Sequence, residues 1–141
     1  MNILRLVLAT LGGFLVYFVI GGLLFWLIPS LKIEFLKYPN VYQPLEGQMS
    51  HLPVGMAAMF QAVLVMALLY ALIYKGGSCL VEGARFGAQI GLFVIFAFVL
   101  HNYANLNIGR RLTLQNAAAY FFEFFATGIV IGLIYRPKVR S

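Results

Sequence analysis

Residues 82–91, EGARFGAQIG, place polar side chains on one side of a helix and glycines on the other. At about 100° per residue, Glu82, Arg85 and Gln89 share one narrow arc. A second arc, roughly opposite, carries glycine at every fourth position: Gly83, Gly87 and Gly91. Small residues at this spacing let two helix backbones approach closely, as helices in lipid do. The stretch therefore predicts a membrane helix that packs through its glycine face and must shield its polar groups.

The composition of the whole chain is that of a membrane protein. Hydrophobic residues make up 62% of the 141 residues and charged residues only 10%, whereas soluble domains average about 45–50% apolar and about 25% charged residues. Four stretches have the roughly 20 apolar residues that cross a hydrocarbon core. These spans are residues 6–28, 53–74, 79–100 and 114–135. We predict an all-α fold in which residues 1–141 form a single domain, a bundle of four transmembrane helices with antiparallel neighbours.

The connections between the spans differ in length. Residues 30–52 form a long connection whose first part, residues 31–35, alternates in polarity and suits a segment lying on the membrane surface. Residues 75–78, KGGS, form a turn short enough to make the second and third spans antiparallel neighbours. Pro53 suits the first helical position of the second span, and Thr113 suits the N-cap of the fourth. The predicted bundle thus has one long interfacial loop between its first and second helices.

An acidic residue lies close to the middle of the fourth span. Glu123 is about 13 Å deep by helical rise, where a charged acid costs about 2.5–3.5 kcal/mol on insertion scales. Gln89 lies about 17 Å deep from the same side, within side-chain reach if the helices are adjacent. We predict a buried polar layer of Glu123 and Gln89. Gln61 is a candidate third member, Arg85 lies at the edge of the layer, and Glu82 is expected to pair with Arg85 at i, i+3 spacing.

The fourth span repeats the glycine pattern of the third. Gly128 and Gly132 lie four residues apart, on a face separate from that of Glu123. Close backbone approach at such faces is a common way for membrane helices to associate. The predicted packing residues are Gly83, Gly87, Gly91, Gly128 and Gly132.

The sequence contains few groups that suit catalysis or metal binding. Cys79 is the only cysteine, which excludes an internal disulfide and a cysteine-pair redox centre. His51 and His101 are expected at the same membrane face with Glu46 nearby, but they lack metal-ligand spacing and are weak metal candidates. A nucleotide-binding loop, a nucleophile elbow and an HExxH motif are also missing. We therefore assign no catalytic residue, no metal and no cofactor.

The positive charges predict a lipid partner and an orientation. The net charge is +6, but the ten Lys and Arg residues are scattered over the segment ends and form no basic stripe. Anionic lipid headgroups are therefore the expected partners, and nucleic acid is not. The side that holds both termini carries Arg5, Lys75, Arg136, Lys138 and Arg140, and the opposite side carries Lys32, Lys37, Arg110 and Arg111. This small excess favours cytoplasmic termini.

Several segments resemble parts of small bacterial four-span membrane proteins that have no assigned function. These segments are GARFGAQIGLF, HNYANLNIG, LTLQNAAAY and GIVIGLIYRP. The resemblance covers nearly the whole chain. It implies a multi-pass protein of the bacterial inner membrane, and it brings no catalytic residue with it.

Three functions from different classes remain open. The first is a non-enzymatic accessory or scaffold component that associates, as a homo-oligomer or within a larger membrane complex, through its glycine faces. The second is a small proton-coupled transporter or channel in which protonation of Glu123 is coupled to solute movement. The third is a membrane enzyme or metal site at His51 and His101. The sequence favours the first and ranks the third last.

Overall fold

The computed structural model describes residues 2–136, apart from the side chain of Leu45, and this part of the chain is helical without strands. The elements are α1 (Ile3–Leu27), α2 (Pro29–Leu36), α3 (Leu45–Ile73), α4 (Cys79–Val94), the π-helix η1 (Ile95–Leu100), α5 (His101–Asn105) and α6 (Arg110–Ile134). Four helical stretches are long and apolar enough to cross a membrane: Ile3–Leu27, Glu46–Ile73, Cys79–Asn105 and Arg110–Ile134. The predicted all-α fold with four transmembrane helices is confirmed.

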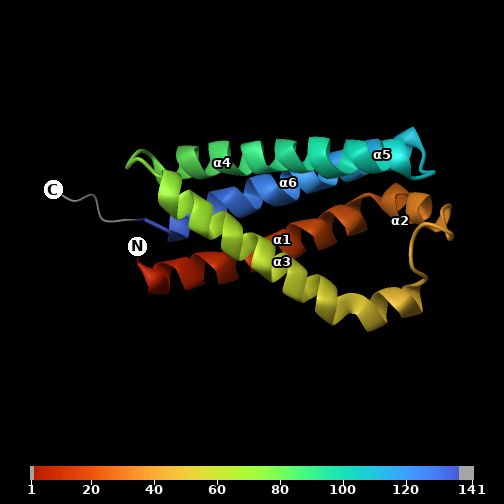
Figure 1. Cartoon of the computed structure of the whole chain (residues 1–141), viewed down its shortest axis with the longest axis horizontal. Helices are drawn as coiled ribbons and strands as arrows, with labels where there is room; N and C mark the ends of the chain where they lie inside the picture. Colours follow the sequence, from red (N-terminus) through yellow and green to blue (C-terminus); the bar gives the residue numbers. More distant parts are fainter. Residues whose placement is uncertain (1, 137–141) are drawn as a thin grey trace.

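The spans pack in the order α4, α6, α1, α3 (Figure 1). α4 lies along α6, α6 lies along α1, and α1 crosses α3. Although a short turn joins α3 to α4, the two helices touch near that turn, where the rings of Tyr70 and Phe86 are 5.5 Å apart, and diverge beyond it (Figure 1). The start of α1 and the end of α6 lie at the same end of the bundle as this turn.

Glycines form the closest helix contact, between α4 and α6. A β-carbon placed on Gly83 would lie 2.6 Å from the Gly128 carbonyl oxygen, and one on Gly132 would lie 2.9 Å from the Gly83 α-carbon. A β-carbon on Gly87 would lie 2.7 Å from the backbone oxygen of Phe124. The structure thus brings the predicted packing glycines together within one chain, and we call this contact the glycine seam: Gly83, Gly87, Gly91, Gly128 and Gly132.

The predicted start of the second span is wrong. α3 begins at Leu45, eight residues earlier than expected, with Pro44 as its N-cap, and Pro53 lies inside the helix. A proline within a helix removes one backbone hydrogen bond, and membrane helices tolerate this loss. The long interfacial loop is correspondingly shorter, because its first part is the helix α2, with Pro29 in the first turn.

The predicted start of the fourth span is also wrong. α6 begins at Arg110 with Gly109 as its N-cap, so Thr113 lies one turn inside the helix. The Thr113 hydroxyl donates a hydrogen bond to the Gly109 carbonyl at 3.0 Å, instead of capping the helix.

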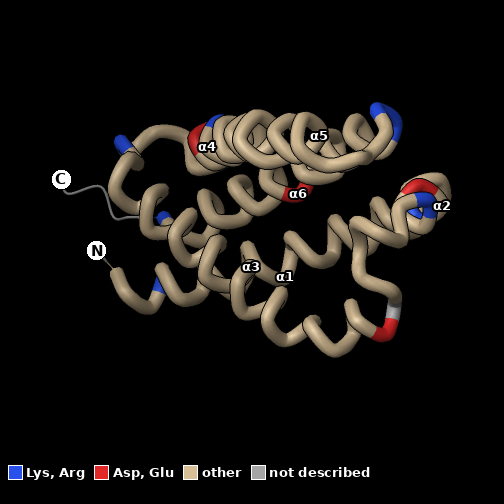
Figure 2. Tube along the Cα trace, turned by 45° about the vertical axis from the view of Figure 1, so that its right-hand side comes forward, with Lys and Arg blue, Asp and Glu red and all other residues tan. Residues whose placement is uncertain are grey.

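Polar contacts fasten α2 to the start of α6. The Glu34 side chain is buried, with 4% of the residue exposed, and its Oε1 lies 2.6 Å from Lys37 Nζ and 3.6 Å from Arg111 Nε. The Tyr38 hydroxyl accepts a hydrogen bond from the Gly109 N–H at 2.8 Å. Charged residues are concentrated at the two ends of the bundle, with one acid midway along α6 (Figure 2). This distribution is what a membrane-spanning bundle requires.

Candidate functional site

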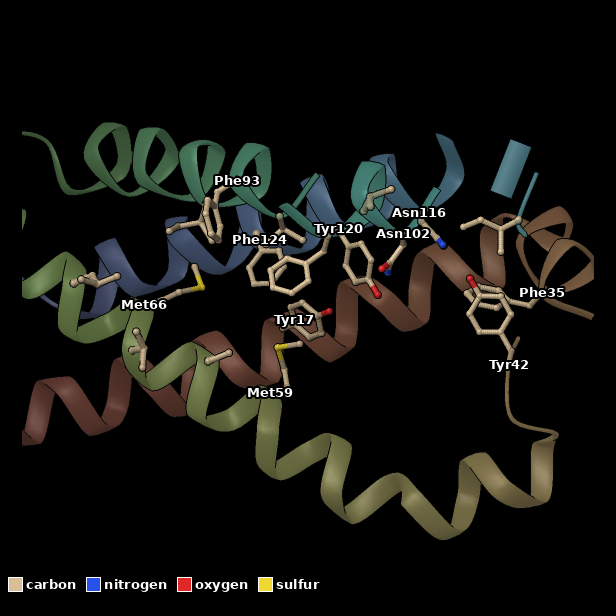
Figure 3. Close-up of a pocket in the computed structure, with 18 residues that line it drawn as sticks. Tyr17, Phe35, Tyr42, Met59, Met66, Phe93, Asn102, Asn116, Tyr120 and Phe124 are labelled. Atoms are coloured by element: carbon tan, nitrogen blue, oxygen red, sulfur yellow. The ribbon is translucent and has the colours of Figure 1, made fainter. Parts of the chain in front are cut away.

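A groove with a volume of about 600 Å³ lies between α3 and the span formed by α4, η1 and α5 (Figure 3). Its volume falls within the range of about 300–1,000 Å³ that is typical of small-molecule sites. The lining residues come from every helical element of the described chain and from the two connections that hold Tyr42 and Ile108. They are Tyr17, Phe35, Tyr42, Met59, Ala62, Val65, Met66, Leu69, Ile90, Phe93, Val94, Phe98, Val99, Asn102, Ile108, Asn116, Tyr120 and Phe124. In a bilayer, an opening between two spans faces the acyl chains.

The groove exists because α3 and α4 pack against different helices. The glycine seam holds α4 close to α6. α3 instead packs on α1, where a β-carbon on Gly13 would lie 3.0 Å from Val63 Cγ1, and Val63 is fully buried. Because α4 is held by α6 and α3 by α1, the two spans separate, and side chains of both line the space between them.

The polar side chains of the groove lie toward one end, where Phe35 also packs against Tyr42, and the other end is apolar (Figure 3). Met66 and Phe93 lie toward the apolar end, and Met59 lies at mid-groove beside Tyr17 (Figure 3). The hydroxyls and amides extend from the middle of the groove to the opposite end, and we call these residues the polar cluster: Tyr17, Tyr42, Asn102, Asn116 and Tyr120 (Figure 3). The lining residues of the described chain include no charged side chain.

The polar cluster reaches from the membrane surface well into the hydrocarbon region. At 1.5 Å per residue, Asn116 lies about 9 Å and Tyr120 about 15 Å from the first residue of α6. At the surface end, Tyr42 interacts with the Asn116 side chain. Burial raises the pKa of Tyr42, and this interaction offsets part of the rise. The Tyr42 hydroxyl therefore remains neutral near pH 7 and can both donate and accept a hydrogen bond.

The π-helix η1 forms part of the groove wall. Its residues Phe98 and Val99 line the groove. π-helical turns are rare, and they occur frequently at functional sites. The sequence IFAFVL of residues 95–100 is uniformly apolar and carries no signal that separates this turn from an ordinary helix.

Glu123 lies directly behind the groove wall, between α6 and α1. The residue is 8% exposed, and a β-carbon on Gly21 of α1 would lie 2.7 Å from its Oε1. Its carboxyl group interacts with Tyr17, which lines the groove. Glu123 Oε2 is buried and has no hydrogen-bond partner within residues 2–136.

The structure does not bring the other predicted polar residues to Glu123. Gln89 and Arg85 are exposed on α4, and Gln61 is exposed on α3. The reason for the first two is geometric: the polar arc of α4 is opposite its glycine arc, and the glycine arc faces α6. A helix that buries one of these faces against α6 must turn the other away from it.

Glu82 caps a turn and does not pair with Arg85 in the described chain. Its Oε1 accepts a hydrogen bond from the Gly77 N–H at 2.9 Å, and its Oε2 lies 3.4 Å from the Lys75 backbone nitrogen, which donates to it. Gly76 in the same turn has a φ of 92°, a conformation that favours glycine. Glu82 thus stabilises the connection from which α3 and α4 diverge.

The candidate metal ligands are also apart from the groove. His51 and His101 are both exposed, and His51 Nδ1 lies 2.7 Å from the Gly47 carbonyl oxygen. Among residues 2–136, no three His, Cys, Asp or Glu side chains are close enough together to hold a metal ion.

The sequence prediction did not include the polar cluster. Asn116 and Tyr120 are spaced i, i+4 on α6 and so share a face, which was a usable signal. Asn102, by contrast, lies in α5, which continues the third span beyond its predicted end, and Tyr42 lies in the connection between α2 and α3. The position of both depends on the whole fold. No protein-family model, no curated protein and no solved structure matches this chain. The groove geometry, together with the four membrane spans, therefore carries the functional inference.

Proposed function

We propose that this multi-pass membrane protein binds one lipid-like amphiphile, taken laterally from the bilayer, in the groove between α3 and α4. The observation that carries the proposal is the change of polarity along the groove, from an apolar end at Met66 and Phe93 to the polar cluster (Figure 3). An amphiphile has the same change along its length. Met59 and Met66 are flexible, polarizable side chains that adapt to apolar chains of different shape.

The role we propose is that of a non-enzymatic, lipid-binding accessory component of the bacterial inner membrane. Association with further copies or with a larger membrane complex remains part of the proposal. The glycine seam is occupied within the chain, so such association would use other surfaces than the glycine faces of α4 and α6.

Filling the groove tests this function. We expect Ala62→Phe to reduce labelling of the groove by a hexadecanol that carries a photoreactive diazirine at mid-chain by at least about tenfold, equivalent to about 1.4 kcal/mol. Ala62 lines the groove, and a phenyl ring there would occupy the space of the chain. The labelled residues are mapped by mass spectrometry of the protein in lipid nanodiscs.

Ala57→Phe is the matched control, because Ala57 lies on the same helix about 140° from Ala62 around the axis and does not line the groove. It should label like the unmodified protein. Equal labelling of both variants and the parent, or labels spread evenly over all exposed helix faces, would reject the proposed function.

A proton-coupled transporter is the second candidate, and the state of Glu123 favours it. The carboxyl group is buried near mid-span with one unpartnered oxygen, and it contacts a residue of the groove wall. Intramembrane acids often mark proton pathways. The test is proton uptake into liposomes that contain the protein. Uptake that accompanies solute movement would favour this function over simple binding, provided that it is lost in Glu123→Gln.

The proposed orientation has both termini in the cytoplasm. Arg5, Lys75 and Arg136 lie at one end of the described bundle, while Lys138 and Arg140 lie outside the described residues. Because Lys and Arg favour the cytoplasmic side, we expect a green fluorescent protein fused after the C-terminus to fluoresce in bacterial cells and an alkaline phosphatase fused there to be inactive. The reverse pattern would invert the orientation without affecting the groove.

A further inference from the structure

We infer that the groove selects neutral lipids whose head group carries at least two oxygen atoms, such as a glycerol monoester, over lipids with a charged head. This inference rests on the proposed function and adds the chemical class of the ligand. It follows from the kind, number and depth of the polar groups in the polar cluster and from the position of the nearby charges outside the groove.

The polar cluster offers only neutral hydrogen-bonding groups. An asparagine amide has a carbonyl acceptor and two N–H donors, and a tyrosine hydroxyl both donates and accepts. Asn102 and Asn116 come from α5 and α6, and both line the same end of the groove (Figure 3). The hydroxyl and ester oxygens of a neutral lipid can form hydrogen bonds with these amides and hydroxyls, and no partner in such a bond needs to be charged.

The depth of the cluster indicates more than one oxygen. Asn116 and Tyr120 are separated by four residues, about 6 Å along α6. Tyr17, from α1, lies at mid-groove with its hydroxyl turned toward Tyr120 (Figure 3), so the cluster extends further still along the groove. A single terminal hydroxyl would leave part of this cluster without a partner, and a polar group that faces acyl chains without a hydrogen-bond partner is costly. A glycerol ester spreads its oxygens over such a distance.

A charged head group would find no counterion inside the groove. None of the lining residues is charged, and an unpaired charge away from water is costly. The nearby cations at this end lie outside the groove: Lys37 and Arg111 lie against Glu34, Arg110 Nε donates a hydrogen bond to the Tyr103 hydroxyl at 3.3 Å, and Lys32 is exposed on α2. Anionic phospholipids are therefore matched to the surface of the protein and not to the groove.

The test compares two probes that share one diazirine-bearing acyl chain: a monoacylglycerol and the phosphate monoester of the same monoacylglycerol. In nanodiscs, we expect the neutral probe to label groove residues at least about tenfold more than its phosphate ester. Asn116→Leu and Asn102→Leu should each reduce this ratio toward one. Asn102 is exposed near the end of α5, so its substitution keeps the test valid if Asn116→Leu does not fold.

Asn107→Leu is the matched control, because Asn107 is exposed and does not line the groove; it should leave the ratio unchanged. Labelling by neither probe would reject the proposed function itself. Equal labelling by both, or stronger labelling by the phosphate ester, would leave lipid binding intact and overturn the selectivity. A ratio unaffected by both asparagine substitutions would overturn the assignment of these residues.

Discussion

Replacing Gly128 with alanine is expected to lower the free energy of unfolding by about 3 kcal/mol or more. This loss equals or exceeds the largest destabilisation that overpacking substitutions typically cause. A β-carbon there would collide with the backbone of Gly87 and would lie 2.7 Å from the Gly83 carbonyl oxygen. Backbone atoms cannot move aside as the end of a flexible side chain can. α4 and α6 would have to separate, and the seam that positions α4 beside the groove would open.

The measurement is thermal unfolding of the detergent-solubilised protein, followed by circular dichroism and by loss of the monodisperse species. Gly22→Ala is the matched control, because a β-carbon on Gly22 of α1 meets no atom within 4 Å. Alanine is favoured over glycine inside a helix by about 1 kcal/mol, so this variant should be as stable as the parent or slightly more stable. Equal destabilisation by both substitutions would show that the seam does not govern stability.

The glycine seam was predictable because its signal is local. Glycines at every fourth position define a face from the helical period alone, and two such faces in one chain can satisfy each other. The four spans were predictable for the same reason, since length and composition suffice. The early start of α3 was not predictable. Proline is common at the first position of a helix, so the sequence around Pro53 alone indicates a helix start there.

The polar layer illustrates the limit of depth arithmetic. Helical rise gives the height of Gln89 and Glu123 in the membrane, and their heights are similar. It does not give the direction in which each side chain points. On α4 the glycine face is opposite Gln89, so once Gly87 is placed against α6, Gln89 must point away. Combining the two predictions made from the same helix would have excluded the pairing.

The groove could not be predicted, because its existence depends on the angle between two helices. The KGGS turn at residues 75–78 fixes where α3 and α4 meet, but not how far they diverge. That angle depends on contacts far along the chain, such as Val63 against Gly13. The π-helical turn adds to the wall without any local signal. The site is therefore a product of tertiary packing, while the helices that form it are a product of local sequence.

Glu123→Gln is expected to keep the fold, to raise the free energy of unfolding by about 0.5–2 kcal/mol, and to impair function. The glutamine amide has the size of the carboxyl group but cannot ionise, and Glu123 takes part in none of the ion pairs of the described residues. The substitution therefore removes the cost of an unpaired buried charge. Relief of such a cost at a functional site typically stabilises a protein while reducing its activity. Stability is measured by thermal unfolding in detergent, and function by photolabelling of the groove and by proton uptake into liposomes.

Glu46→Gln is the control, because Glu46 is exposed in the first turn of α3 and should change neither property. Tyr17→Phe separates two routes by which Glu123 could act. The Tyr17 side chain lines the groove and contacts the carboxyl group, so if Glu123 acts by positioning that hydroxyl, Tyr17→Phe will reproduce the binding defect. If proton uptake is lost in Glu123→Gln while Tyr17→Phe labels normally, the carboxyl group acts as a proton site in its own right. A Glu123→Gln variant that is less stable yet fully functional would instead make the carboxyl group a structural contact between α1 and α6.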